Sequence, residues 1–121
     1  MIRIGIAGVA GRMGRTLVQA VLDKADVARV AAGTTLPDDP QVGTDIGLIA
    51  GVGAQNVKAS AALADCIGDI DVLIDFTSPE ATLDHLAQCV NAGKAIVIGT
   101  TGFTAEQKQT IHDAAQKIPV V

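Results

Sequence analysis

The sequence has no tryptophan and no tyrosine, and it contains only two phenylalanines. Its core must therefore be aliphatic, and hydrophobic residues do make up 49% of the chain. Cores of this kind are typical of parallel strands that are buried on both faces. The only cysteines are Cys66 and Cys89, too few for a disulfide framework. Because both fall in segments with a helical pattern, we interpret them as reduced thiols of the core.

Long apolar runs and an excess of positive charge are also missing. No run approaches the roughly 20 apolar residues of a membrane-spanning helix. The nine basic and 13 acidic residues give a net charge of −4, which argues against nucleic acids and anionic membranes as partners. Residues 1–4 lead directly into a strand, so we expect no signal peptide and a cytoplasmic location. The chain ends at Val121 in an apolar segment that resembles an opening strand, so we expect a piece of a longer protein.

Strand and helix patterns alternate along the 121 residues, a length that suits one domain. The expected strands are 2–7, 27–34, 72–76 and 95–99, with another beginning at Val120. The expected helices are 12–24, 79–91 and 105–117. Between the second strand and residue 72 we expect a long loop over Leu36–Gly53 with room for one helical turn, a short strand at 57–59, and a short helix capped by Ser60 that reaches Cys66 or Ile67. This order predicts an α/β fold in which residues 1–121 form a single Rossmann-type, doubly wound parallel sheet, cut off at its last strand.

Helix boundaries are marked by local signals. Ser78-Pro79-Glu80 combines a capping hydroxyl, a proline at the first helical position and an acid near the positive end of the helix dipole. Gly93 is suited to the left-handed residue that ends this helix. Thr104 and Gln107 have the spacing of a capping box, which predicts the start of the last helix.

The most informative segment is the glycine loop Gly8-Val9-Ala10-Gly11-Arg12-Met13-Gly14. It lies between an expected strand and an expected helix, which is the context of a dinucleotide-binding loop. Small residues let the backbone approach a pyrophosphate, and the helix N-terminus offers unpaired N–H groups. The spacing is unusual because Val9 stands where the first fingerprint glycine is normally found. A purely structural tight turn is the alternative interpretation.

The acid that normally follows the second strand and grips the adenosine ribose is missing. Thr34 and Thr35 stand in its place, and neither repels nor attracts a 2′-phosphate. We therefore expect NADH and NADPH to bind with affinities within about tenfold of each other. A larger preference for NADH would require Asp38 or Asp39 to fold back toward the ribose. A preference for NADPH would indicate Arg12, which is otherwise a solvated residue at the helix start.

Ligands of parallel sheets lie beyond the carboxyl ends of the strands. There the sequence has Phe76-Thr77 and Gly99-Thr100-Thr101-Gly102. The second segment is rich in amides and hydroxyls, and it suits the amide of a nicotinamide ring, a small carboxylated substrate, or a plain turn. No zinc, redox or nucleophile motif is present, and we expect no metal site. His85 and Cys89 would supply only half of one. We expect neither His85 nor His112 at the carboxyl edge of the sheet, and therefore no catalytic residue in this chain.

Several of these segments resemble one family, the dihydrodipicolinate (4-hydroxy-tetrahydrodipicolinate) reductases of lysine and diaminopimelate synthesis. The matching segments are 4–8, Gly11-Arg12-Met13-Gly14-Arg15, Val72–Thr77, Val97–Phe103, and the loop pieces Val42–Asp45 and Leu48–Gly51. The resemblance covers the whole chain, and the order GRMG, DFT, IGTTG is more specific than a glycine loop alone.

The resemblance implies an oxidoreductase that uses NADH or NADPH to reduce a cyclic dicarboxylate to tetrahydrodipicolinate. It implies that Gly8, Val9, Ala10, Gly11, Arg12 and Met13 bind the pyrophosphate, that Thr34 and Thr35 face the adenosine ribose, and that Phe76, Gly99, Thr100 and Thr101 lie at the nicotinamide end. The family's second domain, which binds and protonates the dicarboxylate substrate and forms a homotetramer, is absent. We therefore expect this chain alone to be inactive.

Two other interpretations remain open from the sequence. One is a stand-alone nucleotide-binding or sensor module without catalysis. The other is the cofactor domain of a different dehydrogenase, acting on homoserine or a sugar, which the Gly-Thr-Thr-Gly segment disfavours.

Overall fold

The computed structural model describes all residues 1–121 as four strands, four α-helices and two short 3₁₀ turns. The strands are β1 (Ile2–Ala7), β2 (Ala28–Thr34), β3 (Val72–Asp75) and β4 (Ala95–Ile98). The helices are α1 (Arg12–Leu22), α2 (Ile46–Ala50), α3 (Pro79–Ala92) and α4 (Ala105–Ala114), with 3₁₀ turns η1 (Leu63–Asp65) and η2 (Ile67–Asp69). No helix combines the length and the apolar surface that a bilayer crossing requires.

The four strands form one parallel sheet in the order β2-β1-β3-β4. The step from β1 to β2 therefore crosses the sheet in one direction, and the step from β3 to β4 crosses it in the opposite direction. Right-handed crossovers then place the connecting helices on opposite faces of the sheet. Val120 adds a single parallel bridge to Ile96 on the outer side of β4. The predicted Rossmann-type architecture is confirmed.

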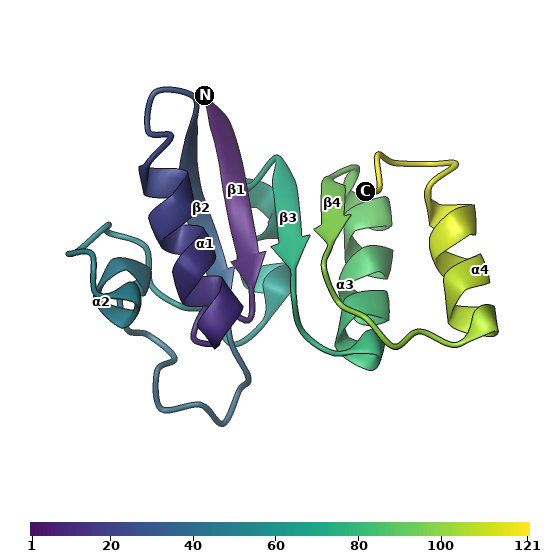
Figure 1. Ribbon diagram of the computed structural model, residues 1–121, viewed down its shortest axis with the longest axis horizontal. Coiled ribbons are helices and arrows are strands. Elements are labelled where there is room, and N and C mark those ends of the chain that lie inside the picture. The colour runs from purple at the N-terminus through teal and green to yellow at the C-terminus, as the bar shows by residue number, and fades with distance from the viewer.

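Helices lie on both faces of the sheet (Figure 1), and each face has its own hydrophobic core. On one face α1 and α2 pack over β1 and β2, and the buried side chains include Ile6, Val18 and Ile46. On the other face α3, α4 and the 3₁₀ turns surround Leu73, among other residues. Alternation along β1 separates the two cores, since Ile6 belongs to one and its neighbour Ala7 to the other.

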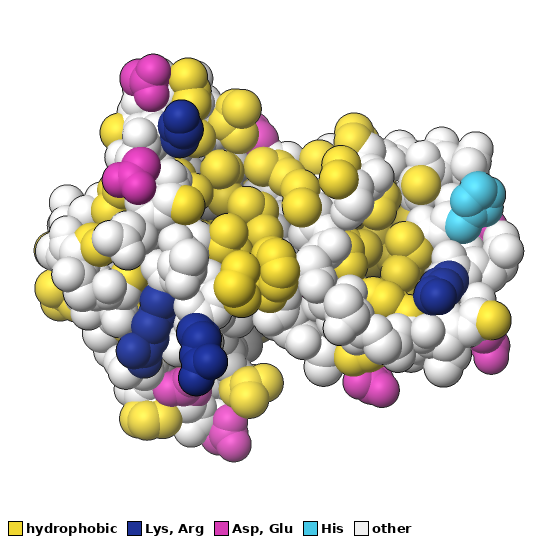
Figure 2. All heavy atoms as spheres, in the orientation of Figure 1, with side chains coloured by type: hydrophobic (Ala, Val, Ile, Leu, Met, Phe, Trp, Pro, Cys, Tyr) yellow, Lys and Arg dark blue, Asp and Glu magenta, His cyan; other side chains and the backbone are white.

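The α1 side of β3 and β4 is left without a helix. Val72 and Ile74 share this side, because they pair in register with Ile4 and Ile6 of β1, which face α1. Val97 of β4 pairs with Ile74 and so faces the same way, and all three side chains are only half-buried. Figure 2 shows hydrophobic side chains gathered on the surface between α1 and α4.

The helix caps predicted from the sequence are present in the structure. The Ser78 hydroxyl accepts a hydrogen bond from the Ala81 N–H, and Gly93 ends α3 with a left-handed φ of 69°. Thr104 and Gln107 make both hydrogen bonds of the capping box. Helices α1 and α4 end two or three residues earlier than predicted, because Lys24 and Lys117 already belong to the turns that follow.

The segment between β2 and β3 departs further from the prediction. The expected turn of helix exists as α2, and its start is organised by Asp45, whose carboxylate accepts N–H hydrogen bonds from Gly47, Leu48, Gln55 and Val57. These bonds, above all the one from the Gln55 N–H, hold the pKa of Asp45 below its usual range. No strand forms at 57–59, where Lys58 makes only one bridge, to Asp45.

The predicted capping role of Ser60 is wrong. Its backbone pairs with the end of β2, accepting from Thr35 N and donating to Gly33 O. The residues after Ser60 form two 3₁₀ turns, and the N-cap of the first is Ala62, which provides no side-chain cap. Ser60 pairs with the sheet instead of capping a helix because this pairing satisfies both its backbone N–H and its backbone carbonyl at the edge of β2.

Candidate functional site

A cavity of about 690 Å³ opens at the carboxyl ends of β1, β2 and β3. Its walls are the glycine loop after β1, the segment after β2 that begins at Thr34, residues Ala61–Ala64, and the segment Phe76–Ser78 together with one side of α3. The chain runs from β1 to β2 on one side of the cavity and from β3 to β4 on the other. The cavity therefore lies at the point where the direction of winding reverses, which is where open α/β sheets bind ligands.

The glycine loop brings the backbone of β1 against the start of α1. Gly8 has a φ of +77°, and the N–H groups of Gly8 and Val9 both donate to the Thr34 carbonyl. A Cβ added at Gly14 would overlap the Gly8 carbonyl, so only glycine allows this close packing. Gly11 occupies the N-cap position without a side-chain cap.

The first turn of α1 is left with unpaired donors. No backbone hydrogen bond uses the N–H groups of Arg12, Met13 or Gly14. They lie at the positive end of the helix dipole, next to the cavity-lining residues Ala10 and Gly11. This arrangement is chemically suited to an anion such as a diphosphate.

Three of the six predicted loop residues lie outside the cavity wall. Val9 is fully buried in the core beneath α1, and its N–H is already bonded to Thr34, so neither its side chain nor its N–H can meet a ligand. This burial explains why valine is tolerated at a position where glycine is usual. Arg12 and Met13 are exposed and line no part of the cavity with their side chains.

The end of β2 and the loop that follows it form the second wall of the cavity. Thr34 and Thr35 both line the cavity, as does Asp39. The Thr35 hydroxyl donates to Asp39 Oδ2 at 2.8 Å, and the Gln41 N–H donates to Oδ1 at 2.8 Å. These two bonds, with the backbone bond the stronger influence, hold the pKa of Asp39 below its usual range.

The residues after β3 and β4 are tied together, but only those after β3 reach the cavity. Thr100 Oγ1 accepts from the Thr77 N–H at 2.9 Å and from the Thr82 hydroxyl at 2.8 Å. The Phe76 ring packs against Gly99 so closely that a Cβ on this glycine would overlap it. Gly99, Thr100 and Thr101 therefore adjoin the Phe76 end of the site and do not line the cavity.

The expectation that His85 lies away from the carboxyl edge is wrong. His85 lines the cavity from α3, and its Nδ1 lies 2.7 Å from Asp75 Oδ2 at the end of β3. Asp75 is fully buried and also accepts from the Thr77 hydroxyl at 2.6 Å. An acid that ends a wholly apolar strand was the sequence signal for this pair, because such a carboxylate needs a buried donor. His112 is exposed on α4.

Metal ligation has no support in this geometry. No group of three or more His, Cys, Asp or Glu side chains is placed to hold an ion. Cys89 is fully buried, and burial, reinforced by the nearby Asp75 charge, raises the pKa of its thiol to about 11. The His85 ring is already engaged with Asp75.

Comparison with known proteins gives a consistent result. Residues 2–121 match the family described as "Dihydrodipicolinate reductase, N-terminus". A 4-hydroxy-tetrahydrodipicolinate reductase of Acinetobacter baumannii is 52% identical over 119 residues, which are 98% of this chain and 43% of the relative. One from Hahella chejuensis is 51% identical over 121 residues, covering 100% of this chain and 45% of the relative. The chain thus spans less than half the length of these relatives.

Solved structures show the same likeness. Dipicolinate-bound dihydrodipicolinate reductase from Paenisporosarcina sp. TG-14 superposes with a TM-score of 0.73 at 30% identity, covering 95% of this chain and 43% of that one. The WlbA dehydrogenase from Chromobactrium violaceum, solved in complex with NADH and UDP-GlcNAcA, gives a TM-score of 0.76 at 24% identity and covers 99% of this chain and 34% of that one. The second likeness is evidence of a shared fold only.

Proposed function

Because this chain belongs to the dihydrodipicolinate reductase family as its N-terminal domain, we propose that it holds the nicotinamide dinucleotide with which a 4-hydroxy-tetrahydrodipicolinate reductase reduces its substrate. The observation that carries the proposal is the cavity at the reversal point of the sheet, which is continuous with the glycine loop at Gly8 to Gly11. A ligand that carries a diphosphate next to an aromatic base and a ribose fits a site with a helix N-terminus at one wall and a half-apolar cavity beside it.

The residues fit the diphosphate at the start of α1. The N–H groups of Arg12, Met13 and Gly14 are free to donate, and Gly8 and Gly11 present no side chain that would keep a phosphate from the backbone. In this proposal the negative charge of the diphosphate is stabilised by backbone N–H groups, since no lysine or arginine lines the cavity. In this proposal Arg12 and Met13 contribute through their backbone, and Val9 only supports the loop from below.

The two ends of the site have different characters. The adenosine half of the cofactor occupies the cavity. Thr34 and Thr35 form one wall around it, and His85 of α3 and Ala61–Ala64 form the opposite wall. The nicotinamide end lies toward Phe76, Gly99 and Thr101, because these residues follow the next strands in the sheet. Thr100 holds the two strand ends together through its hydrogen bonds to Thr77 and Thr82, and Thr101 is exposed to solvent beside it.

The reaction assigned by this proposal is hydride transfer to a cyclic dicarboxylate, giving tetrahydrodipicolinate, and the bound reduced dinucleotide supplies the hydride. The substrate, its proton donor and the assembly into a tetramer belong to the remaining length of the relatives, of which this chain spans 43% to 45%. The cytoplasm is the compartment that fits, since both cysteines are free and buried and nicotinamide reductions of biosynthesis take place there.

A titration of the chain with NADH and NADPH tests the proposal. We expect saturable binding of at least one of them, and we expect Gly11→Val to weaken it by about tenfold or more, roughly 1.4 kcal/mol. A Cβ at Gly11 stands 3.3 Å from the Gly8 carbonyl, so the loop tolerates the change with a small shift while the added methyl groups block the backbone. Gly68→Val is the matched control, because this glycine is exposed with no neighbour within 4 Å of an added Cβ. Equal affinity in wild type and a folded Gly11→Val variant would refute the proposal.

A further inference from the structure

We propose that Asp39 is the carboxylate that receives the adenosine ribose hydroxyls and selects NADH over NADPH. This inference rests on the proposed function. Dinucleotide-binding domains normally place such an acid directly after the second strand, where this chain has Thr34 and Thr35. The threonines alone predict similar affinities for the two cofactors. The fold changes this expectation by returning an acid from the following loop to the same wall of the cavity.

The position of Asp39 is fixed by two hydrogen bonds. Thr35, at the end of β2, donates its hydroxyl to Oδ2, and the Gln41 N–H donates to Oδ1, each at 2.8 Å. The first bond ties the carboxylate to the residue that occupies the usual place of the acid. A carboxylate has about four acceptor sites, so two remain for hydroxyl groups of a ligand. Asp39 is half-buried and lines the cavity together with Thr34 and Thr35.

The charge of Asp39 is the basis of the selectivity. Its pKa lies below the usual range because of the Gln41 and Thr35 hydrogen bonds, so the side chain is ionised at neutral pH. An ionised carboxylate accepts from the ribose 2′- and 3′-hydroxyls of NADH and repels the 2′-phosphate of NADPH. The only other titratable side chains lining the cavity are Asp84 and His85, both on α3.

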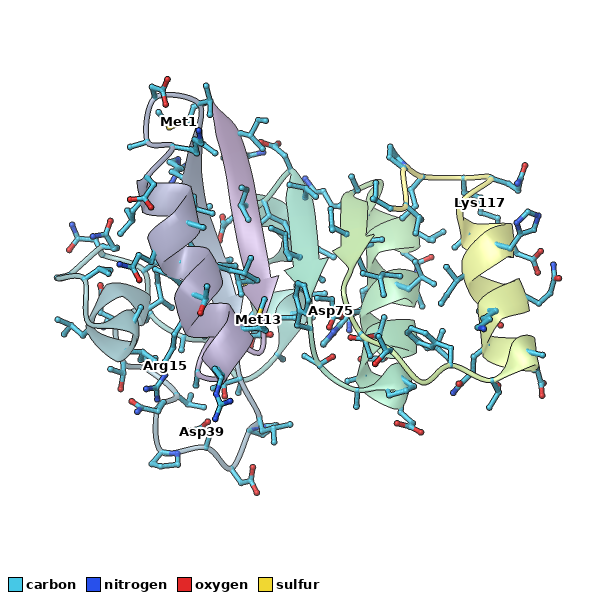
Figure 3. All side chains as sticks on the ribbon, in the orientation of Figure 1. Met1, Met13, Arg15, Asp39, Asp75 and Lys117 are labelled. Carbon is cyan, nitrogen blue, oxygen red and sulfur yellow. The ribbon has the colours of Figure 1, made fainter.

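No arginine forms an ion pair with the Asp39 carboxylate. Arg15, on α1, is near enough for its positive charge to help lower the pKa of Asp39, and Figure 3 shows the two side chains at the same end of the molecule. Its Nε donates to the Ala10 carbonyl at 3.1 Å, and no ion pair joins it to Asp39. Neither Arg15 nor Arg12 lines the cavity. The neighbouring Asp38 is exposed and outside the cavity wall, so it provides a control of equal charge.

The experiment measures the dissociation constants of NADH and NADPH for the chain, for Asp39→Asn and for Asp38→Asn, using the fluorescence of the reduced nicotinamide. We expect wild type to bind NADH more tightly than NADPH by about tenfold or more. Asp39→Asn should lower this ratio by about fivefold or more, mainly through tighter NADPH binding, and Asp38→Asn should change it by less than about twofold. Thermal melting of each variant shows whether the loop substitution leaves the fold intact, and Asp39→Ser provides a second neutral side chain if the asparagine variant unfolds.

The outcomes separate this inference from the proposed function. If neither cofactor binds the wild-type chain, the proposed function fails and this inference fails with it. If both bind but the wild-type ratio is smaller than about tenfold, or favours NADPH, the selectivity assigned to Asp39 is overturned while the proposed function stands. The inference is equally overturned if Asp39→Asn leaves the ratio unchanged or if Asp38→Asn lowers it as much.

Discussion

The Nδ1 atom of His85 lies 2.7 Å from Oδ2 of Asp75, and this contact joins helix α3 to the end of strand β3. Asp75 is completely buried, and its other oxygen accepts the Thr77 hydroxyl. A carboxylate only accepts hydrogen bonds, so the Nδ1 of His85 is the donor. The pair therefore fixes the histidine in the cavity wall and gives a buried charge its partner.

Loss of this histidine should destabilise the fold. In His85→Ala, the Asp75 carboxylate keeps only the Thr77 hydroxyl, and leaving a buried acceptor short of a donor costs about 1–3 kcal/mol. Urea denaturation measures the difference. His112→Ala is the matched control, since this histidine is exposed on α4 and should change the stability by less than about 0.5 kcal/mol. A His85→Ala protein as stable as the control would show that the contact contributes nothing.

Gly14→Ala should also destabilise the chain, although alanine is the better helix former. The new methyl group would overlap the Gly8 carbonyl and Val9, which are backbone atoms that cannot move without opening the loop. Overpacking of this kind costs about 1–3 kcal/mol. Gly68→Ala, at an open position, is the comparison. Equal denaturation midpoints for these two variants would contradict the close approach of α1 to β1.

Acid should weaken the link between β1 and the start of β3. Hydrogen bonds from the Arg3 side chain and N–H lower the pKa of Asp71 to about 2. A carboxyl whose folded pKa lies below its unfolded value of about 3.9 contributes stability above that value and loses it as the pH falls toward about 2. Arg3→Gln should therefore reduce the loss of stability between about pH 4 and pH 2.

Melting temperatures measured across this window test the prediction. Arg29→Gln is the control, since Arg29 pairs with Arg3 across the strands but makes no ion pair. Identical pH profiles for the two arginine variants would show that the Arg3–Asp71 pair does not influence acid stability.

The chain by itself should not turn over the dicarboxylate substrate. Positioning of reactants supplies about 7–11 kcal/mol in enzymes, and general acid catalysis a further factor of roughly 10²–10⁴. The one histidine that lines the cavity, His85, has its Nδ1 bonded to Asp75 and lies by the part that we propose for the adenosine half of the cofactor. The measurement is the loss of nicotinamide absorbance after substrate and NADPH or NADH are supplied. Turnover at an ordinary enzymatic rate, free of full-length enzyme, would mean that a proton donor lies within residues 1–121.

Much of this protein follows from local signals in the sequence. The glycine loop, the Ser78-Pro79 helix start and the Thr104–Gln107 capping box each act through neighbouring backbone groups, so a short stretch of sequence is sufficient to predict them. Aliphatic runs at near-regular spacing were sufficient to predict the parallel sheet. The resemblance to the reductase family came from the same segments, because the carboxyl ends of the strands carry the residues that face a ligand.

Contacts between distant segments depended on the tertiary structure. The sequence has Asp75 and His85 ten positions apart, and only the packing of α3 against β3 brings them together. Asp39 stands beyond the usual place of a ribose-binding acid, and the turn through Thr35 and Gln41 returns it to the cavity. Val9 was expected at a ligand because of its place in the motif, but the direction of its side chain is set by the core beneath α1. The sequence determines which groups are available, and the crossing of strands and helices decides which of them meet, because that crossing depends on burial summed over the whole chain.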